Sequence, residues 1–419
     1  MRANKKWFLL LEALFMIVTL VGCSSSNKSQ GPVTTNIPEG ELDPAVWGKE
    51  FPLVYESYKK TAEGGMTKYG GSDKVSKFEH EPEIVELFKG YGFSKEYNED
   101  RGHVYTIEDV TSIARVNDKT TGSCMTCKAA EVPKLIEEMG DAYYTTPFSE
   151  IKEMVNHPVS CSDCHDEKTM ELKITRQTFI DAMDRRGIDV TKATKEEMRA
   201  YVCGQCHVEY YFEPETKKVT FPWDNGLGPD EQYQYYQEKL PGWSDWTHPD
   251  SGAGMIKVQH PEFETWSTGT HGAAGVTCAD CHMPYMRDEK GQKYSSHWWT
   301  SPLKTIEASC TTCHQEDKEW LEERVLYTQD RTMELQAKAA KVLVEAHAEI
   351  KKATETEGVN KEKLEEAKKL VVEGQWRWDW IAAENGRGFH NPAQGLHNLG
   401  KAIELGYKAK EKAQEAVGK

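Results

Sequence analysis

The chain has 419 residues, of which 68 are acidic and 52 basic, so its formal net charge at pH 7 is -16. A protein this acidic is a poor nucleic-acid binder, because the phosphate backbone repels it. Apolar residues make up only 38% of the chain and charged residues 29%, which is apolar-poor for a globular protein of this length. Either part of the chain is disordered, or something other than side chains fills the core.

The first 23 residues are typical of an export signal. Arg2, Lys5 and Lys6 precede an apolar run over residues 7–21, which is too short for a comfortable membrane span. The run ends in Leu20-Val21-Gly22-Cys23, which resembles the bacterial lipoprotein box. We therefore expect residues 1–23 to be a lipoprotein signal peptide, with Cys23 lipidated. The protein would be exported and held on the outer face of the cytoplasmic membrane, on the periplasmic side if an outer membrane is present. An ordinary signal peptide that happens to contain a cysteine is the alternative.

The rest of the chain divides by composition. Residues 24–42 begin rich in Ser, Thr, Gly and Pro, which predicts a flexible tether. Residues 43–315 mix short helical patterns, Gly-rich turns and a few short strand signals without a clear linker, which predicts one continuous domain. Residues 316–419 carry apolar side chains at helical spacing and predict long amphipathic helices with charged faces. We expect these helices to be continuous with the domain before them, to cap its core and to form a dimer interface.

Ten of the 11 cysteines fall into five pairs with two residues between the members. Four pairs are followed at once by histidine, which is the attachment signature of c-type haem: the thiols bind the haem covalently and the imidazole reaches the iron. Zinc is the alternative, but zinc sites do not need a histidine directly after each pair. We predict five covalent haems, which would also fill an apolar-poor core. The pairs are Cys124/Cys127, Cys161/Cys164, Cys203/Cys206, Cys278/Cys281 and Cys310/Cys313, and the histidines are His165, His207, His282 and His314.

The first pair departs from this pattern, because Cys124-Met125-Thr126-Cys127 is followed by Lys128. A lysine amine binds iron only when it is unprotonated, so the metal must hold its pKa down. Three alternatives stay open: the pair carries no haem, its haem takes a ligand from elsewhere, or the lysine is a harmless drift. One odd site among four regular ones predicts a division of labour. Haems with histidine on both faces would carry electrons, and the odd haem would keep one face open for substrate.

The histidine supply is sufficient for four haems with two histidine ligands each. There are 14 histidines, so ten remain outside the motifs, and four of them are needed. Our candidates are His103, His271, His297 and His390, although spacing alone does not select them. We interpret His347, within a predicted long helix, as a surface or core histidine.

Several segments around these motifs resemble the ammonia-forming cytochrome c nitrite reductases. They are the Tyr97-Asn98-Glu99 and Gly102-His103 segments, Cys203 to Tyr211, Phe221-Pro222-Trp223-Asp224, His260 to Trp266, and His271-Gly272 followed by Cys278 to Pro284. Together with the lysine in the first of five motifs, the resemblance covers residues 77–419. It implies a mainly α multihaem fold, five haems c, calcium, and the six-electron reduction of nitrite to ammonium.

The resemblance also implies roles for individual residues. Lys128 would be the proximal ligand of the active-site haem, whose open face Arg115, Tyr210 and His260 would line. Beside it, calcium would take the side chains of Glu209 and Gln259 and the backbone carbonyls of Tyr210 and Lys257. The distal histidines would be His297 for the second haem, His103 for the third, His390 for the fourth and His271 for the fifth, with His397 as the rival of His390.

The side-chain chemistry agrees with these roles. Arg115 is a permanent cation that can hold the oxygens of nitrite, His260 and Tyr210 can donate protons, and carboxylate and amide oxygens suit calcium. The long helices predict a homodimer, and the resemblance further implies a membrane-bound multihaem quinol dehydrogenase as electron donor. The competing functions are an anchored electron-transfer cytochrome with all haems closed, and a reductase acting mainly on hydroxylamine or sulfite.

Overall fold

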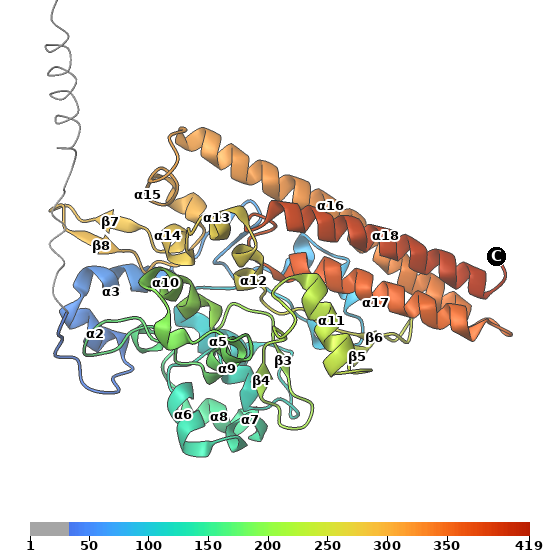
Figure 1. Ribbon diagram of the computed structural model, residues 1–419, viewed down its shortest axis with the longest axis horizontal. Coiled ribbons are helices and arrows are strands. Elements are labelled where there is room, and N and C mark those ends of the chain that lie inside the picture. Colours follow the sequence, from blue (N-terminus) through green and yellow to red (C-terminus); the bar gives the residue numbers. More distant parts are fainter. Residues whose placement is uncertain (1–32) are drawn as a thin grey trace, which may run out of the picture.

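The computed structural model describes residues 33–419, so the predicted signal peptide with Cys23, and the predicted tether up to residue 32, lie outside the described residues. The predicted mainly α fold with few short strands is confirmed: short helices and loops form most of the body, and three long helices lie along one side of it (Figure 1). Among residues 33–419, no helix is long and apolar enough to cross a membrane.

Short helices make up the part of the chain that carries the cysteine pairs. Before the second pair these are α2 (Pro44–Glu50), α3 (Pro52–Lys59), α4 (Ile84–Leu87), α5 (Thr106–Ser112), α6 (Val132–Met139), α7 (Ala142–Thr145) and α8 (Phe148–Ile151). After it come α9 (Gln177–Arg185), α10 (Lys195–Gly204), α11 (Pro229–Lys239), α12 (Glu262–Ser267), α13 (Thr270–Ala273), α14 (Cys278–His282) and α15 (Ile306–Ser309).

The strands of residues 33–419 form four separate two-stranded antiparallel hairpins. They are β1 (Met66–Thr67) with β2 (Gly70–Gly71), β3 (Tyr211–Phe212) with β4 (Val219–Thr220), β5 (Trp246–Thr247) with β6 (Gly254–Met255), and β7 (Tyr285–Arg287) with β8 (Lys293–Ser295). None of these hairpins is long enough to form a hydrophobic core, so the helices determine the fold.

The three predicted long helices are α16 (Lys318–Thr354), α17 (Lys361–Ala383) and α18 (Pro392–Ala416). Side chains cap their first turns: Asp317 accepts from the N–H of Trp320 at 2.8 Å, and Asn391 accepts from that of Gln394 at 3.1 Å, each worth about 1 kcal/mol. Small residues let the helices approach closely. A Cβ on Gly406 would lie 2.8 Å from Cγ1 of Val342, so a larger residue there would force α16 and α18 apart.

Three buried tryptophans tie α17 to the rest of the molecule. The indole N–H of Trp376 donates to the carbonyl of Pro229 at 2.9 Å, that of Trp378 to the carbonyl of Gln336 at 3.2 Å, and that of Trp380 to Oγ1 of Thr265 at 3.1 Å. The hydrophobic core of the long helices also includes residues of α4, α11 and the β5–β6 hairpin. The long helices therefore share their core with elements of residues 43–315.

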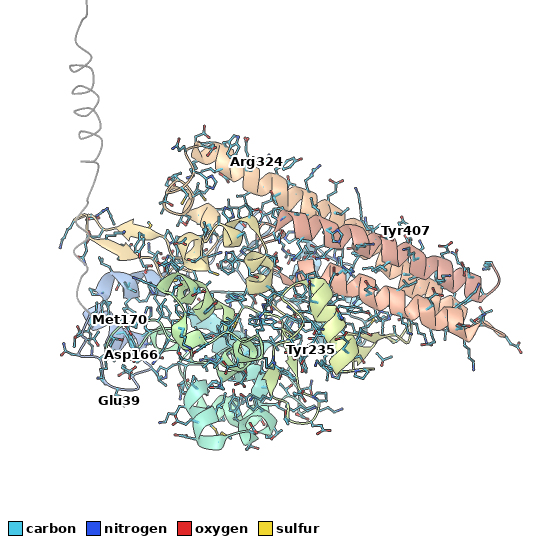
Figure 2. All side chains as sticks on the ribbon, viewed as in Figure 1. Glu39, Asp166, Met170, Tyr235, Arg324 and Tyr407 are labelled. Carbon is cyan, nitrogen blue, oxygen red and sulfur yellow. The ribbon has the colours of Figure 1, made fainter. Side chains whose placement is uncertain are left out.

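Residues 33–42, the part of the predicted tether that the structure describes, pack against the rest of the protein. Thr35 and Ile37 are buried, and the N–H of Thr35 donates to the carbonyl of Lys168 at 3.1 Å. The ammonium of Lys168 donates to the carbonyl of Ile37 at 2.7 Å. Glu39 and Asp166 lie at the same end of the molecule (Figure 2). Within the expected tether of residues 24–42, the segment from Thr35 onward is thus fixed to the loop after the second cysteine motif.

Candidate active site

A branched cavity of about 3160 Å³ runs through the body of the protein. All ten paired cysteines line it, and no disulfide joins any cysteine of residues 33–419. The five residues that follow the pairs, Lys128, His165, His207, His282 and His314, line it too. The apolar-poor composition is thus matched by an interior that side chains leave open, at the place where covalent haems would attach.

Each cysteine pair lies on a short helical turn. The N–H of His165 donates to the carbonyl of Cys161 at 2.9 Å, and the N–H of His314 donates in the same way to Cys310 at 2.9 Å. This turn brings the two thiols and the imidazole to one side of the backbone. The N–H of Lys128 instead donates to the carbonyl of Met125 at 2.9 Å, so the first motif forms a tighter turn of the same kind.

The four motif histidines each face one of the four predicted distal histidines across the cavity. An iron with two imidazole ligands would hold the ring centres roughly 6.2 Å apart, because each metal–nitrogen bond is about 2 Å and each nitrogen lies about 1.1 Å from its ring centre. The described rings match this spacing. Their centres lie 6.1 Å apart in His165/His297, 6.2 Å in His103/His207, and 6.3 Å in His282/His390 and His271/His314.

The ring nitrogens are also prepared for metal binding. Nδ1 of His165 lies 3.0 Å from the carbonyl of Met170, and Nδ1 of His282 lies 3.1 Å from that of Thr300. Donation from Nδ1 leaves Nε2 unprotonated and free for iron. Burial lowers the pKa of His282 to about 4 and that of His103 to about 3, which favours the neutral form that metals bind. The residues present therefore fit four haems with histidine on both faces.

The rival ligand, His397, does not meet these conditions. It lies on the exposed side of α18, whereas His390 precedes that helix and lines the cavity. Nδ1 of His390 is hydrogen-bonded to the fully buried carboxylate of Glu384. The geometry therefore pairs His390, and not His397, with His282.

The surroundings of Lys128 differ from those of the histidines. Arg115, Tyr210 and His260 line the same cavity. Burial raises the pKa of Tyr210 well above its ordinary value, and the Arg115 guanidinium acts against this shift. Burial lowers the pKa of His260 to about 3, and the nearby charge of Lys128 adds to this effect. The structure thus brings the three predicted catalytic side chains together near the lysine motif.

An aromatic ring supports the guanidinium of Arg115. Its central carbon lies 3.9 Å from the centre of the Phe93 ring, and Nη1 donates to the carbonyl of Glu96 at 3.4 Å. In the part of the chain that the structure describes, no carboxylate forms an ion pair with this guanidinium. A cation held by a ring face keeps its charge and most of its N–H groups available for an anion.

The predicted calcium ligands also lie together. The carboxylate of Glu209 is fully buried and accepts from the N–H of Gln259 at 2.5 Å and the hydroxyl of Tyr236 at 2.9 Å. The Gln259 side chain lies 3.3 Å from the carbonyl of Lys257. Burial raises the pKa of Glu209 well above its ordinary value, and a divalent cation would relieve that burial penalty. Glu209, Gln259 and the carbonyl of Lys257 thus lie together. Tyr210, whose carbonyl is the fourth predicted ligand, directly follows Glu209 in the chain.

Two other residues of this region were not selected from the sequence. Asp100 lines the cavity; burial acts to raise its pKa, but the charges of His260, Lys77 and Lys128 outweigh burial and lower it to about 2. Arg176 is buried against the lysine motif. Asp100 lies between the Tyr97-Asn98-Glu99 and Gly102-His103 segments, and Arg176 lies in no motif.

Comparison with known proteins agrees with the residues and their geometry. A family profile described as cytochrome c552 matches residues 43–419. The chain is 40% identical to the cytochrome c nitrite reductase subunit NrfA of Nitratidesulfovibrio vulgaris, over 99% of this chain and 88% of that protein. It is 36% identical to cytochrome c-552 of Parabacteroides distasonis, over 99% and 87%.

A solved structure shares the fold as well. The catalytic subunit NrfA of cytochrome c nitrite reductase from Desulfovibrio desulfuricans, which has two calcium sites, superposes with a TM-score of 0.88 at 39% identity, covering 92% of this chain and 89% of that one. With five cysteine pairs, four facing histidine pairs and a lysine in the first motif, the chain belongs to the cytochrome c552 family.

Proposed function

We infer that the protein is a pentahaem cytochrome c nitrite reductase that takes nitrite through six electrons to ammonium. The observation that carries this function is an asymmetry in the cavity. Four motif histidines face a second histidine at the spacing of a doubly ligated iron, whereas Lys128 lies near Arg115, Tyr210 and His260. An open face lined by a cation and proton donors suits the reduction of a small anion.

The assignment of ligands follows from the facing pairs. Lys128, His165, His207, His282 and His314 would be the proximal ligands, and His297, His103, His390 and His271 would complete the last four haems in that order. When bound, the haems would pass on electrons from the donor and provide the iron at which nitrite is reduced. Four haems with two ligands each would relay electrons to the one that Lys128 holds.

The chain's own side chains would bind the anion and deliver protons. Arg115 faces the cavity with an unpaired positive charge on the Phe93 ring, and it would hold the nitrite oxygens and stabilise negative charge on them. The imidazole of His260 and the hydroxyl of Tyr210 would donate protons to the departing oxygens.

Calcium would hold two of these residues in place. The side chains of Glu209 and Gln259 and the carbonyls of Tyr210 and Lys257 are the proposed ligands, supported by the contacts among them. Each of the two side-chain ligands directly precedes a catalytic residue, Tyr210 or His260. A cation bound there would therefore fix the backbone from which both proton donors extend.

The assembly and location are proposals that rest on further features. Tyr327 on α16 and Tyr407 on α18 are 55% and 57% exposed, and Arg324 and Tyr407 project from the long helices (Figure 2). Aromatic and arginine side chains are typical of protein interfaces, so a second copy would dock here as a homodimer. Light scattering of the purified protein measures the mass of the particle in solution. A mass equal to that of one chain would contradict the dimer.

The electron donor would be a membrane-bound multihaem quinol dehydrogenase, with the protein exported and anchored near it through lipid on Cys23. Recovery of the mature protein in the membrane fraction, and its release by substitution Cys23→Ala with an intact signal, would support the anchor. Free solubility of the wild type after lysis would count against it.

The decisive test is an assay with reduced viologen on protein that carries five haems. Stoichiometric conversion of nitrite to ammonium is expected, and no ammonium from fully loaded protein would refute the function. Lys128→His should keep five haems and lower turnover, because imidazole changes the ligand of the reactive haem. Specificity constants for nitrite, hydroxylamine and sulfite, measured side by side, would establish which substrate is preferred.

A further inference from the structure

One buried arginine connects three of the five haem-attachment motifs. The side chain of Arg176 is 1% exposed. Its Nε donates to the carbonyl of Thr126 at 2.7 Å, and its Nη2 donates to the carbonyl of Ala129 at 3.1 Å. These two carbonyls flank Lys128 in the chain, so the guanidinium holds the backbone on both sides of the lysine.

The same guanidinium reaches the second motif. Nη2 also donates to Oδ1 of Asp163 at 2.7 Å, in an ion pair that is almost fully buried. Asp163 directly precedes Cys164, and its other carboxylate oxygen accepts from the N–H of Ser160 at 2.8 Å. That second bond closes the helical turn at the start of the motif. A short and rigid link therefore fixes the second motif relative to Lys128.

Gln205 extends the link to the third motif. Its Oε1 accepts from the N–H groups of Thr175 and Arg176 at 3.0 and 3.2 Å, and its Nε2 donates to the carbonyl of Asp163 at 2.9 Å. The Gln205 side chain is 2% exposed. Both polar atoms of the Gln205 amide therefore hold the third motif against the second and against the backbone at Arg176.

The three contact points occupy equivalent places. Thr126, Asp163 and Gln205 each stand directly before the second cysteine of their motif. The equivalent Asp280 of the fourth motif pairs instead with Arg199 at 2.6 Å. Arg176 therefore joins the first three motifs and not the fourth.

We propose that Arg176 is a positioning residue that holds Lys128 on the axis of the reactive haem and in register with the second and third haems. The proposal rests on the inferred role of Lys128 as an iron ligand. A lysine has a long, flexible stem and one ligating nitrogen, so its reach depends on a fixed backbone more than that of a rigid imidazole does. Guanidinium offers five donors in one plane with a permanent charge, which an ammonium cannot reproduce.

The test compares Arg176→Lys with Arg185→Lys in the full, haem-loaded protein. Arg185 is a matched control because it also donates to a carboxylate, Asp224 at 2.7 Å, and to a carbonyl, Phe221 at 2.7 Å, but contacts no motif. The first readout is the absorption and paramagnetic resonance change when cyanide binds one haem in five. The second is kcat with nitrite.

In R176K we expect five haems, unchanged signals from the four histidine haems and an altered signal from the cyanide-binding haem. Turnover should fall about 10- to 100-fold, the range for a displaced catalytic group, while R185K stays within about twofold of the wild type. Five haems with an unchanged cyanide-binding signal and wild-type turnover in R176K would overturn the proposal. A general loss of stability would lower the melting temperature without singling out one haem.

If R176K lacks a haem, peptide mapping decides the matter. The empty motif should be one of the first three, with Cys124/Cys127 expected first, since Arg176 holds the carbonyls on both sides of Lys128. An empty fourth or fifth motif would overturn the proposal. Failure of the wild type to form ammonium would refute nitrite reduction but not this role, because the cyanide signal needs no turnover.

Discussion

The ion pair between Lys257 and Asp379 offers a sharp test of how the long helices support the active site. Both side chains are fully buried, and the Lys257 ammonium donates to the two carboxylate oxygens of Asp379 at 2.8 and 3.0 Å. Asp379, on α17, also accepts from the N–H of Val258 at 2.8 Å. The helix thereby holds the segment that leads directly to Gln259 and His260.

Asp379→Leu keeps the approximate shape of the side chain but leaves a buried ammonium without its carboxylate partner. Burial alone lowers the pKa of Lys257 and raises that of Asp379, so each charge depends on the other. Removing one member of such a pair costs about 3–5 kcal/mol. With an unfolding entropy of about 2.1 cal/mol/K per residue, a cooperative chain of this length should melt roughly 3–6 °C lower.

The assay is calorimetry of the haem-loaded protein together with nitrite turnover. The double variant Lys257→Met/Asp379→Leu should recover most of the lost stability, since matched apolar residues replace buried pairs without penalty. Turnover should fall in both variants, because the N–H of Val258 loses its acceptor. A single variant that melts with the wild type, or a double variant as unstable as the single, would refute the reasoning.

Three further outcomes are expected from the described contacts. Glu384→Gln should raise the reduction potential of the haem at His390, because the buried carboxylate makes the imidazole a stronger donor to ferric iron. Glu316→Gln is the control, because the half-exposed carboxylate of Glu316 lies 3.8 Å from Nδ1 of His314. Equal shifts in both variants would contradict the prediction. Burial lowers the pKa of His347 to about 3, so the unfolded chain binds more protons below pH 6.5 and stability falls as pH drops from 6.5 toward 3, by up to about 1.4 kcal/mol per pH unit. His347→Gln should flatten that fall in melting temperature, and an unchanged slope would show that other groups cause it. A calcium chelator should lower turnover of the wild type and have no further effect on Glu209→Gln; chelator sensitivity that persists in the variant would place the cation elsewhere.

The sequence was sufficient for those parts of the structure that short-range patterns determine. Cysteine spacing gave the attachment motifs, and apolar periodicity gave the long helices after residue 315, although it did not mark the start of α18 at Pro392. The signal for that start, Asn391 followed by proline at the first helical position, was present in the sequence. Composition alone cannot tell a free tether from a segment pinned by backbone bonds, so the contacts from Thr35 onward were not foreseen.

The parts that escaped prediction depend on contacts between distant residues. Arg176 lies 48 residues after Lys128 in the chain, and nothing near it marks it as different from a surface arginine. The pairing of His103 with His207 or of His271 with His314 likewise joins segments that spacing does not relate. Only the resemblance to a family ordered these pairs, and the facing rings now support that order on physical grounds.

If Cys23 carries lipid, the contacts from Thr35 onward would limit how far the protein can stand from a membrane. Thr35 follows Cys23 by twelve residues, and a fully extended chain of that length spans about 40 Å. With lipid on Cys23, the loop at Glu167 and Lys168, just after His165, would stay within this distance of the bilayer. The second motif, whose His165 lies three residues before Lys168, would then stay near the membrane and near a donor embedded in it.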